Sequence, residues 1–136
     1  MQIRLIQKKI RWIKGVAHES VQEYLYQSST AFFPSLWENL SYACIEAMAA
    51  GCTAVVSDCG GFPELITNRV NGILVKTGDV AQWTSVMIDI LTNEQQFSRL
   101  GTAAAEHINR HYSCETVCLK TEEIYLDCIR KSDVKR

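Results

Sequence analysis

The segment PSLWENLSYACIEAMAAG, residues 34 to 51, places two glutamates, Glu38 and Glu46, in an otherwise apolar stretch. If both side chains belonged to one helix, their separation of eight positions would put the Cα atoms ~12 Å apart. That distance disfavours a hydrolase, because the paired carboxyl groups that cleave a glycosidic bond lie ~5 to ~9.5 Å apart. The spacing instead suits an extended ligand that lies along the first turns of a helix, with one polar group held at each end.

The first turn of that helix, at Asn39, Leu40 and Ser41, is a predicted phosphate site. A helix start carries unpaired amide N–H groups and the positive end of the helix dipole, so a phosphate bound there needs no lysine. Glu46 lies in an apolar run, where an ionised carboxylate without partners would cost roughly several kcal/mol. Two hydroxyl groups of a ligand diol would satisfy this carboxylate. The pattern therefore predicts a sugar nucleotide as the ligand.

The elements that position these residues are predicted to be short strands alternating with longer helices. Capping boxes at Ser20–Glu23, Asp79–Gln82 and Thr92–Gln95 indicate helix starts. The alternation is typical of βα units around a parallel sheet flanked by helices. The predicted fold is therefore α/β and Rossmann-like, with about four strands against the roughly six of a complete doubly wound sheet. The predicted strands are 9–15, 30–35, 53–57 and 73–75, and the predicted helices are 20–27, 40–50, 79–91, 92–109 and 114–129.

Composition indicates one ordinary domain. The 136 residues are 47% hydrophobic with a net charge of -1, so we expect a single core and no binding of nucleic acid. No apolar run approaches the ~20 residues that span a bilayer, and the N-terminus lacks the apolar core of a signal peptide. These features predict a cytoplasmic protein. The basic residues between positions 8 and 14 predict a weak attraction to anionic lipid at the inner face of the membrane.

The six cysteines show no disulfide framework and no C-x-x-C pair. We therefore expect small, mostly buried apolar residues in a reducing compartment. One spacing that suits zinc, His107, His111, Cys114 and Cys118, is interrupted by Ser113, which is a favourable N-cap. The four side chains would then be split between two helices, and no metal site is predicted.

Three further features bear on the site. Trp37 and Trp83 are predicted to be packing anchors rather than sugar platforms. His18 has two interpretations, an approach to the base or a place in a solvated turn, and the turn is favoured. The pair Gly60–Gly61 has two interpretations, a simple turn or a close approach of two backbone segments.

Several blocks follow the two glutamates in a fixed order between about residue 10 and residue 127. They are EAMAAG at 46–51, the paired glycines with Pro63–Glu64, NGILV at 71–75 and the helix start at Gly78–Asp79. In this order they resemble the C-terminal half of the retaining glycosyltransferases of family 4, also called glycosyl transferases group 1. Those enzymes have the GT-B architecture of two facing Rossmann-like domains. The resemblance implies that the chain is a donor-nucleotide-binding domain.

The resemblance also implies a reaction and roles for individual residues. The reaction is transfer of a hexose-type sugar from a nucleotide diphosphate to an acceptor hydroxyl with retention, in polysaccharide or glycoconjugate synthesis. The leaving diphosphate takes the acceptor proton, and neither a cofactor nor an essential metal is expected. The implied roles are Glu38 at the reacting centre, Glu46 on the ribose hydroxyls, the amides of Asn39, Leu40 and Ser41 toward the sugar and diphosphate, and the turn of Gly15, Val16 and Ala17 against the base.

Two departures from the family pattern matter. Leu40 and Ser41 replace Phe and Gly, a mild change because these positions would contribute backbone amides. The acceptor domain and the first strands of the donor domain have no counterpart in the 136 residues. The resemblance thus implies one truncated domain, with a family-like core at 10–127 and frayed tails at 1–9 and 131–136. It also implies an acceptor domain supplied in cis or by a separate subunit.

Other functions stay open at this point. A non-catalytic remnant or subunit would bind a nucleotide or a partner protein without transferring sugar. A dinucleotide-dependent oxidoreductase is disfavoured because no G-x-G-x-x-G follows the first predicted strand. A sugar-nucleotide epimerase with the GT-B layout would use other acids, which have no evident place in this sequence.

Overall fold

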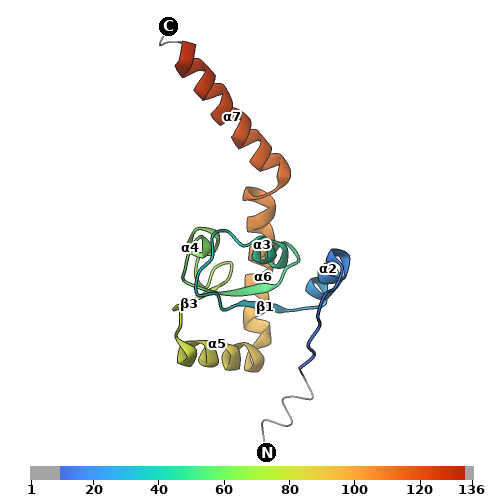
Figure 1. Ribbon diagram of the computed structural model, residues 1–136. Helices are drawn as coiled ribbons and strands as arrows, with labels where there is room; N and C mark the ends of the chain where they lie inside the picture. Colours follow the sequence, from blue (N-terminus) through green and yellow to red (C-terminus); the bar gives the residue numbers. More distant parts are fainter. Residues whose placement is uncertain (1–9, 134–136) are drawn as a thin grey trace, which may run out of the picture.

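Three parallel strands form the centre of the computed structural model, which describes residues 10 to 133 (Figure 1). The strand order is β1-β2-β3, with Thr30 opposite Thr53 and Val55 opposite Ile73. This Rossmann-like α/β arrangement confirms the predicted fold class. The strands are β1 (Thr30–Phe33), β2 (Thr53–Ser57) and β3 (Ile73–Val75); the helices are α2 (His18–Tyr26), α3 (Tyr42–Ala49), α4 (Phe62–Leu65), α5 (Val80–Thr92), α6 (Glu94–His111) and α7 (Cys114–Asp133).

Strand β2 is buried along all five residues because it lies between the other two strands and between two apolar layers. Its side chains alternate between the two faces of the sheet. Ala54 and Val56 pack in one cluster with residues of α3, α4 and α6, whereas Val55 packs in the other with residues of α5 and α6. Burial on both faces explains why an unbroken apolar run forms a strand here.

Helix α6 packs so closely on the turn between α3 and β2 that no side chain fits between them. A Cβ on Gly101 would lie 2.0 Å from the carbonyl oxygen of Gly51. Nearby, the buried hydroxyl of Thr53 donates a hydrogen bond of 2.7 Å to the carbonyl oxygen of Phe97. Leaving such a buried hydroxyl without its acceptor would cost about 1–3 kcal/mol. These two contacts set the position of α6 relative to β2.

The predicted strand at 9–15 is wrong for the part that the structure describes, because residues 10 to 15 form no strand. Ile10 and Trp12 are 64% and 86% exposed, and the segment runs away from the sheet (Figure 1). Residues with high β-propensity form a strand only where a neighbouring strand and a packed face receive them. The described sheet therefore has three strands rather than about four.

Helix ends follow the predictions only where the predicted cap makes its hydrogen bond. Asp79 accepts from the Gln82 amide at 2.9 Å, and Ser113 accepts from the Thr116 amide at 3.2 Å. The helix starts predicted at Asp79 and at Ser113 are both confirmed. The cap at Thr92 is wrong, because its hydroxyl donates to the Ile88 carbonyl oxygen within α5. The cap at Ser20 is also wrong, since α2 already begins at His18.

Burial corrects two predictions about individual side chains. Trp83 is 8% exposed and is a packing anchor, as predicted, but Trp37 is 79% exposed and is not. Cys44 and Cys52 are buried. The expectation of mostly buried cysteines fails for three exposed thiols, because α7 presents them to solvent: Cys114, Cys118 and Cys128.

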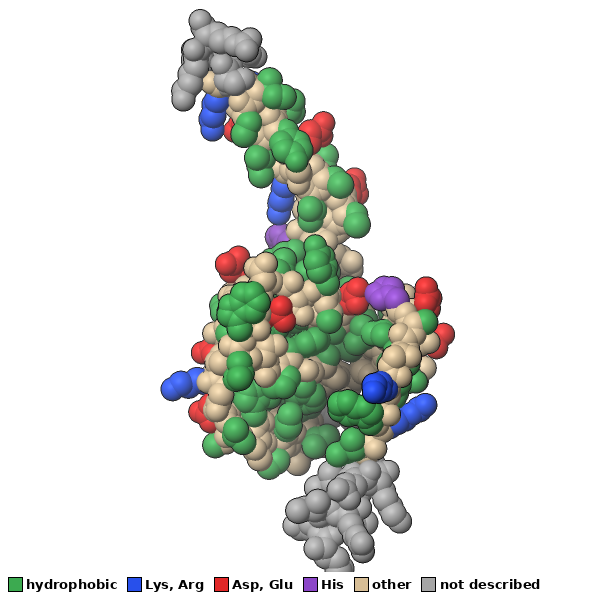
Figure 2. Space-filling view, viewed as in Figure 1, with side chains coloured by type: hydrophobic (Ala, Val, Ile, Leu, Met, Phe, Trp, Pro, Cys, Tyr) green, Lys and Arg blue, Asp and Glu red, His purple; other side chains and the backbone are tan. Residues whose placement is uncertain are grey.

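Helix α7 projects from the α/β layers (Figure 1), and Figure 2 shows hydrophobic side chains along its length. Ile124 and Tyr125 are 62% and 66% exposed. Residues 131 to 133 continue this helix, and the remaining residues of the two predicted tails lie outside the described part of the chain. No helix in that described part is long and apolar enough to cross a membrane.

Candidate donor-binding site

Two loops meet at the carboxyl ends of β1 and β2, where parallel sheets bind ligands. The loop after β1 carries Glu38 and Asn39, and the loop after β2 carries Gly60 and Gly61. The Gly61 amide donates a hydrogen bond of 2.7 Å to the Asn39 carbonyl oxygen. A Cβ on Gly60, which has φ +55°, would lie 1.5 Å from the Glu38 carbonyl oxygen. The paired glycines thus allow a close backbone approach, the second of the two interpretations.

Glu38 lies in the loop before α3 and not on the helix itself. The predicted helix at 40–50 likewise excludes Glu38, and the ~12 Å separation calculated for two glutamates on one helix does not apply. The side chain is half-buried, and its Oε1 accepts a hydrogen bond of 3.2 Å from the Asn39 amide. Behind it, burial and then the charge of Glu38 raise the pKa of the Cys44 thiol to about 12.

Glu46 lies on α3 and points toward α2. Its side chain is 38% exposed, so the expectation of a carboxylate in fully apolar surroundings is wrong. Among the described residues, its recorded ion-pair partner is the His18 ring, which is charged only when protonated, with Nε2 at 3.9 Å from Oε1 of Glu46. A cavity of about 110 Å³ lies beside this carboxylate between the two helices. It is lined by Gln22, Leu25, Tyr26, Glu46, Ala49 and Ala50.

The predicted amide donors differ in their hydrogen bonds. Ser41 is the N-cap of α3, and its Oγ accepts from the Cys44 amide at 3.4 Å. The Asn39 amide already donates to Glu38, so a ligand oxygen there would share that donor. Within residues 10 to 133, no hydrogen bond to a protein acceptor is found for the amides of Leu40 and Ser41. Those two groups are free to donate to a ligand.

The turn of Gly15 and Val16 leads directly into α2. Gly15 has φ +64°, a Cβ added to it would meet no atom within 4 Å, and Val16 is 44% exposed. Two residues further on, the His18 ring lies near Glu46. The predicted base contact and the predicted ribose contact are therefore at the same end of α2, whereas no described contact links this turn to Glu38.

Sequence reasoning missed the contacts of three residues, of which one, His18, lies at the candidate site. His18 is predicted to lie in a solvated turn, but it faces Glu46 from the first turn of α2. Asp58 bridges the ends of β2 and β3, because Oδ1 accepts from both the amide and the hydroxyl of Thr77 at 2.7 Å. These hydrogen bonds lower the pKa of Asp58. Asn71, 3% exposed, bonds the Thr67 amide and the Leu65 carbonyl oxygen. An Asp that directly follows a buried strand was the available signal for Asp58.

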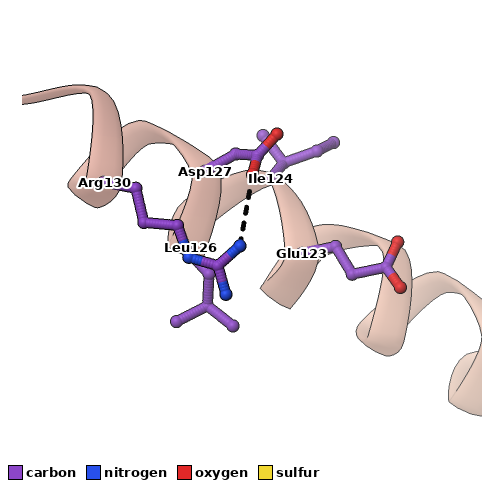
Figure 3. A pocket seen from close by; sticks show the side chains of 5 residues that line it. All are labelled: Glu123, Ile124, Leu126, Asp127 and Arg130. Atoms are coloured by element: carbon purple, nitrogen blue, oxygen red, sulfur yellow. Dashed lines mark ion pairs between the residues drawn. The ribbon is translucent and has the colours of Figure 1, made fainter.

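A larger hollow, about 490 Å³, lies along α7 and far from these residues in the chain. Figure 3 shows that its lining side chains all come from one helix. They include the exposed ion pair of Arg130 and Asp127, with N and O 3.8 Å apart, and such pairs contribute little. A hollow bounded by a single helix cannot enclose a ligand. The junction of the two loops with α3 is the better candidate site.

Parallel strands, with βα loops that meet at their carboxyl ends and free amides before a helix, define a Rossmann-like α/β domain. The sequence profile of the family described as glycosyl transferases group 1 matches residues 1–107, most of the chain. The chain belongs to this family.

Relatives and solved structures agree with that assignment. The glycogen synthase of Mycobacterium tuberculosis is 27% identical over 116 residues, which is 85% of this chain and 28% of the relative. The sucrose-phosphate synthase of Thermosynechococcus elongatus superposes with a TM-score of 0.84 at 22% identity, covering 96% of this chain and 33% of that one. Anabaena HepE in complex with UDP-glucose superposes with a TM-score of 0.73 at 18% identity, covering 79% and 30%. The chain thus spans no more than about a third of these proteins.

Proposed function

We propose that this chain is the donor-binding part of a retaining glycosyltransferase of family 4. The reaction would transfer a hexosyl-type sugar from a nucleotide diphosphate to an acceptor hydroxyl, in polysaccharide or glycoconjugate synthesis. Family membership supports a role in glycosyl transfer, and a structural neighbour holds UDP-glucose. The feature that carries the proposal is the order along the chain of Glu38, the free amides of Leu40 and Ser41, and Glu46, a row that corresponds to the sugar, the diphosphate and the ribose of a sugar nucleotide.

Each group of the row has a proposed task. The amides of Leu40 and Ser41, with the positive end of the α3 dipole, would stabilise the diphosphate. Glu46 would accept hydrogen bonds from the ribose diol. Glu38, held at the loop junction by the Asn39 amide, would contact the transferred sugar near the reacting carbon. The leaving diphosphate would take the proton from the acceptor hydroxyl, so no protein base and no metal is assigned to that step.

The proposal requires a partner, because transfer needs donor and acceptor held together. An acceptor-binding domain, in cis or as a separate subunit, would supply the facing half of the site. Two exposed apolar regions support such a partner, since exposed apolar patches mark interaction surfaces. One surrounds Glu38 and includes Leu36, Trp37 and Tyr42, which are 76–79% exposed; the other runs along α7.

The proposed location is the cytoplasm, with weak contact to the inner face of the membrane. Of the basic residues that would attract anionic lipid, Arg11 and Lys14 are exposed on the described segment before α2. Each basic residue near an anionic surface contributes about 1 kcal/mol. Co-sedimentation with anionic vesicles, lost in the Arg11→Ala and Lys14→Ala double variant, would support this contact, and equal sedimentation with neutral vesicles would contradict it.

The ribose assignment is tested by Glu46→Ala. Loss of a charge-assisted hydrogen bond should weaken nucleotide-sugar binding by about 2 kcal/mol, roughly 30-fold. Isothermal titration calorimetry of the complete chain with UDP-glucose and with GDP-mannose measures this change. The matched control is Glu123→Ala, an exposed glutamate on α7, which should leave affinity unchanged.

Two results would change the proposal. Equal affinity of Glu46→Ala and the unsubstituted chain would remove the ribose assignment. Binding of nucleotide sugars without transfer, even when an acceptor-binding domain of a relative is added, would favour the non-catalytic binding function.

A further inference from the structure

The His18 ring lies between two partners that compete for one nitrogen. Its Nε2 is 3.4 Å from Nε2 of Gln22, one turn further along α2, and 3.9 Å from Oε1 of Glu46 on α3. The ring is 60% exposed and the carboxylate 38% exposed, so both can change their contacts without repacking the core.

The two partners differ in hydrogen-bonding chemistry. The Gln22 amide can donate through its NH₂ group or accept through its oxygen by turning over, whereas an ionised carboxylate only accepts. When Nε2 carries no proton, its lone pair accepts from Gln22 and repels Glu46. When the ring is protonated, Nε2–H and the positive charge attract Glu46. The protonation state of His18 therefore selects which partner it holds.

The contact with His18 is the recorded interaction that can orient the Glu46 side chain. In the described part of the chain, the contact with His18 is the one ion pair or hydrogen bond recorded for the Glu46 carboxylate. The cavity of about 110 Å³ beside it gives the carboxylate room for other rotamers. Fixing a flexible side chain before the ligand arrives lowers the entropy cost of binding.

We propose that His18 is a positioning residue, which holds one oxygen of Glu46 and directs the other toward the ribose diol of a nucleotide sugar. A carboxylate has acceptor capacity for the imidazole and for two hydroxyl groups together. Gln22 retains the neutral ring away from Glu46. Nucleotide-sugar affinity thus rises as His18 gains a proton. This inference rests on the proposed function of Glu46.

Within residues 10 to 133, no second histidine lies on α2 or α3, the two helices that make this contact. On α3, the other titratable side chains are Tyr42, at the first turn, and Cys44, which is buried against the core with a pKa of about 12. Where β2 begins, the Cys52 thiol bonds the carbonyl oxygens of Leu25 and Ser28, and burial raises its pKa. On α2 itself, the other titratable side chains are Glu19, Glu23, Tyr24 and Tyr26.

The experiment measures UDP-glucose and GDP-mannose affinity of the complete 136-residue chain by calorimetry between about pH 5.5 and pH 8. The diphosphate of these diesters does not titrate in this range. The unsubstituted chain should bind roughly 3- to 10-fold more tightly at the acidic end. His18→Gln should give a flat profile at the weaker level. His18→Arg, which keeps a positive charge, should give a flat profile at the tighter level.

Two further variants separate positioning from a general structural or charge effect. His18→Gln combined with Glu46→Gln should weaken binding by less than the sum of the single changes, because the two residues act together. His111→Gln removes a histidine that lines a different cavity, with Thr67 and Asn71, and should retain the pH profile.

The outcomes distinguish failure of the positioning role of His18 from failure of the proposed nucleotide-sugar binding. A flat profile of the unsubstituted chain, a sloping profile of His18→Gln, or additive effects in the double variant would overturn the positioning role while leaving nucleotide binding intact. Absence of binding for every nucleotide sugar at every pH would instead overturn the proposed function.

Discussion

The α/β layers and helix α7 are built from similar apolar side chains but use them in opposite ways. Strand β2 is buried on all five residues, and α6 touches the turn before it backbone to backbone. The twenty residues of α7 extend into solvent, with Ile124 and Tyr125 more than 60% exposed. The formation of α7 therefore depends on local signals, such as the Ser113 cap, whereas the formation of the sheet depends on packing.

The same contrast explains where the candidate site lies. Glu38 and Gly60 come together because β1 and β2 are neighbours in a packed sheet. Helix α7 carries acids, bases and exposed thiols as well, but nothing in the described structure opposes them. Chemistry that needs several groups at fixed positions requires the packed region. Substitutions in each region test how far the two differ.

The largest effect is expected for Gly101→Ala. The new Cβ would lie 2.0 Å from the Gly51 carbonyl oxygen, so α6 would have to move away from the start of β2. We expect a loss of about 4 kcal/mol or more in the free energy of unfolding, measured by urea denaturation. Thr102→Ala, at the next and exposed position of α6, is the control and should change stability little. A Gly101→Ala protein as stable as the unsubstituted chain would contradict the close contact.

A matched pair of isoleucines compares the two regions directly. Ile108 on α6 is 4% exposed, and Ile124 on α7 is 62% exposed. Ile108→Ala should cost about 2–5 kcal/mol because it leaves a cavity in the core, whereas Ile124→Ala should stay within about 0.5 kcal/mol. Both values come from urea denaturation at one pH. Equal costs would mean that α7 is packed in solution.

The buried thiol of Cys44 predicts a loss of stability at high pH. Its pKa is raised to about 12, first by burial and then by Glu38, so the folded chain keeps this proton after the unfolded chain has lost it. Stability should therefore fall above about pH 9, by up to roughly 1.4 kcal/mol per pH unit. Cys44→Ala should show a shallower decline in urea denaturation between about pH 9 and pH 10.5. Parallel declines would show that the thiol does not cause the loss.

The smallest effect is expected at His107, close to the junction with α7. Its Nε2 is buried without a hydrogen-bond partner among the described residues. Burial, followed by the charges of His111 and Arg110, lowers the pKa of His107. The folded chain therefore binds this proton less readily than the unfolded chain, and stability should fall as the pH drops below about 6.5. His107→Gln should reduce that acid-dependent loss in thermal unfolding, and an unchanged pH dependence would refute the assignment.

Much of the fold was predictable from local patterns. The run TAVVS indicated β2, Asp79 and Ser113 indicated helix starts, and all three predictions are confirmed. These signals act within one or two turns of chain, through a cap or through burial of a short apolar run. The strand predicted at 9–15 failed because β-propensity alone supplies no neighbouring strand.

The candidate site was predictable only as a set of residues. Glu38, Glu46 and Gly60–Gly61 stood out by type and spacing, but a separation calculated along one helix does not describe the two glutamates, because Glu38 lies in the loop before α3. The contact of His18 with Glu46 joins residues 28 positions apart, and no local pattern signals it. The residues next to Trp37 in the sequence likewise gave no sign that its side chain is exposed.

The sequence by itself determined which side chains are available and which segments form helices and strands, because hydrophobic period, caps and glycines act on nearby residues. The tertiary structure alone decided which of these side chains meet. Parallel pairing of β1 with β2 brings the Glu38 loop onto Gly60, and the packing of α2 against α3 brings His18 to Glu46. Those contacts join distant segments of the chain, so they depend on how all the helices and strands pack their apolar faces together.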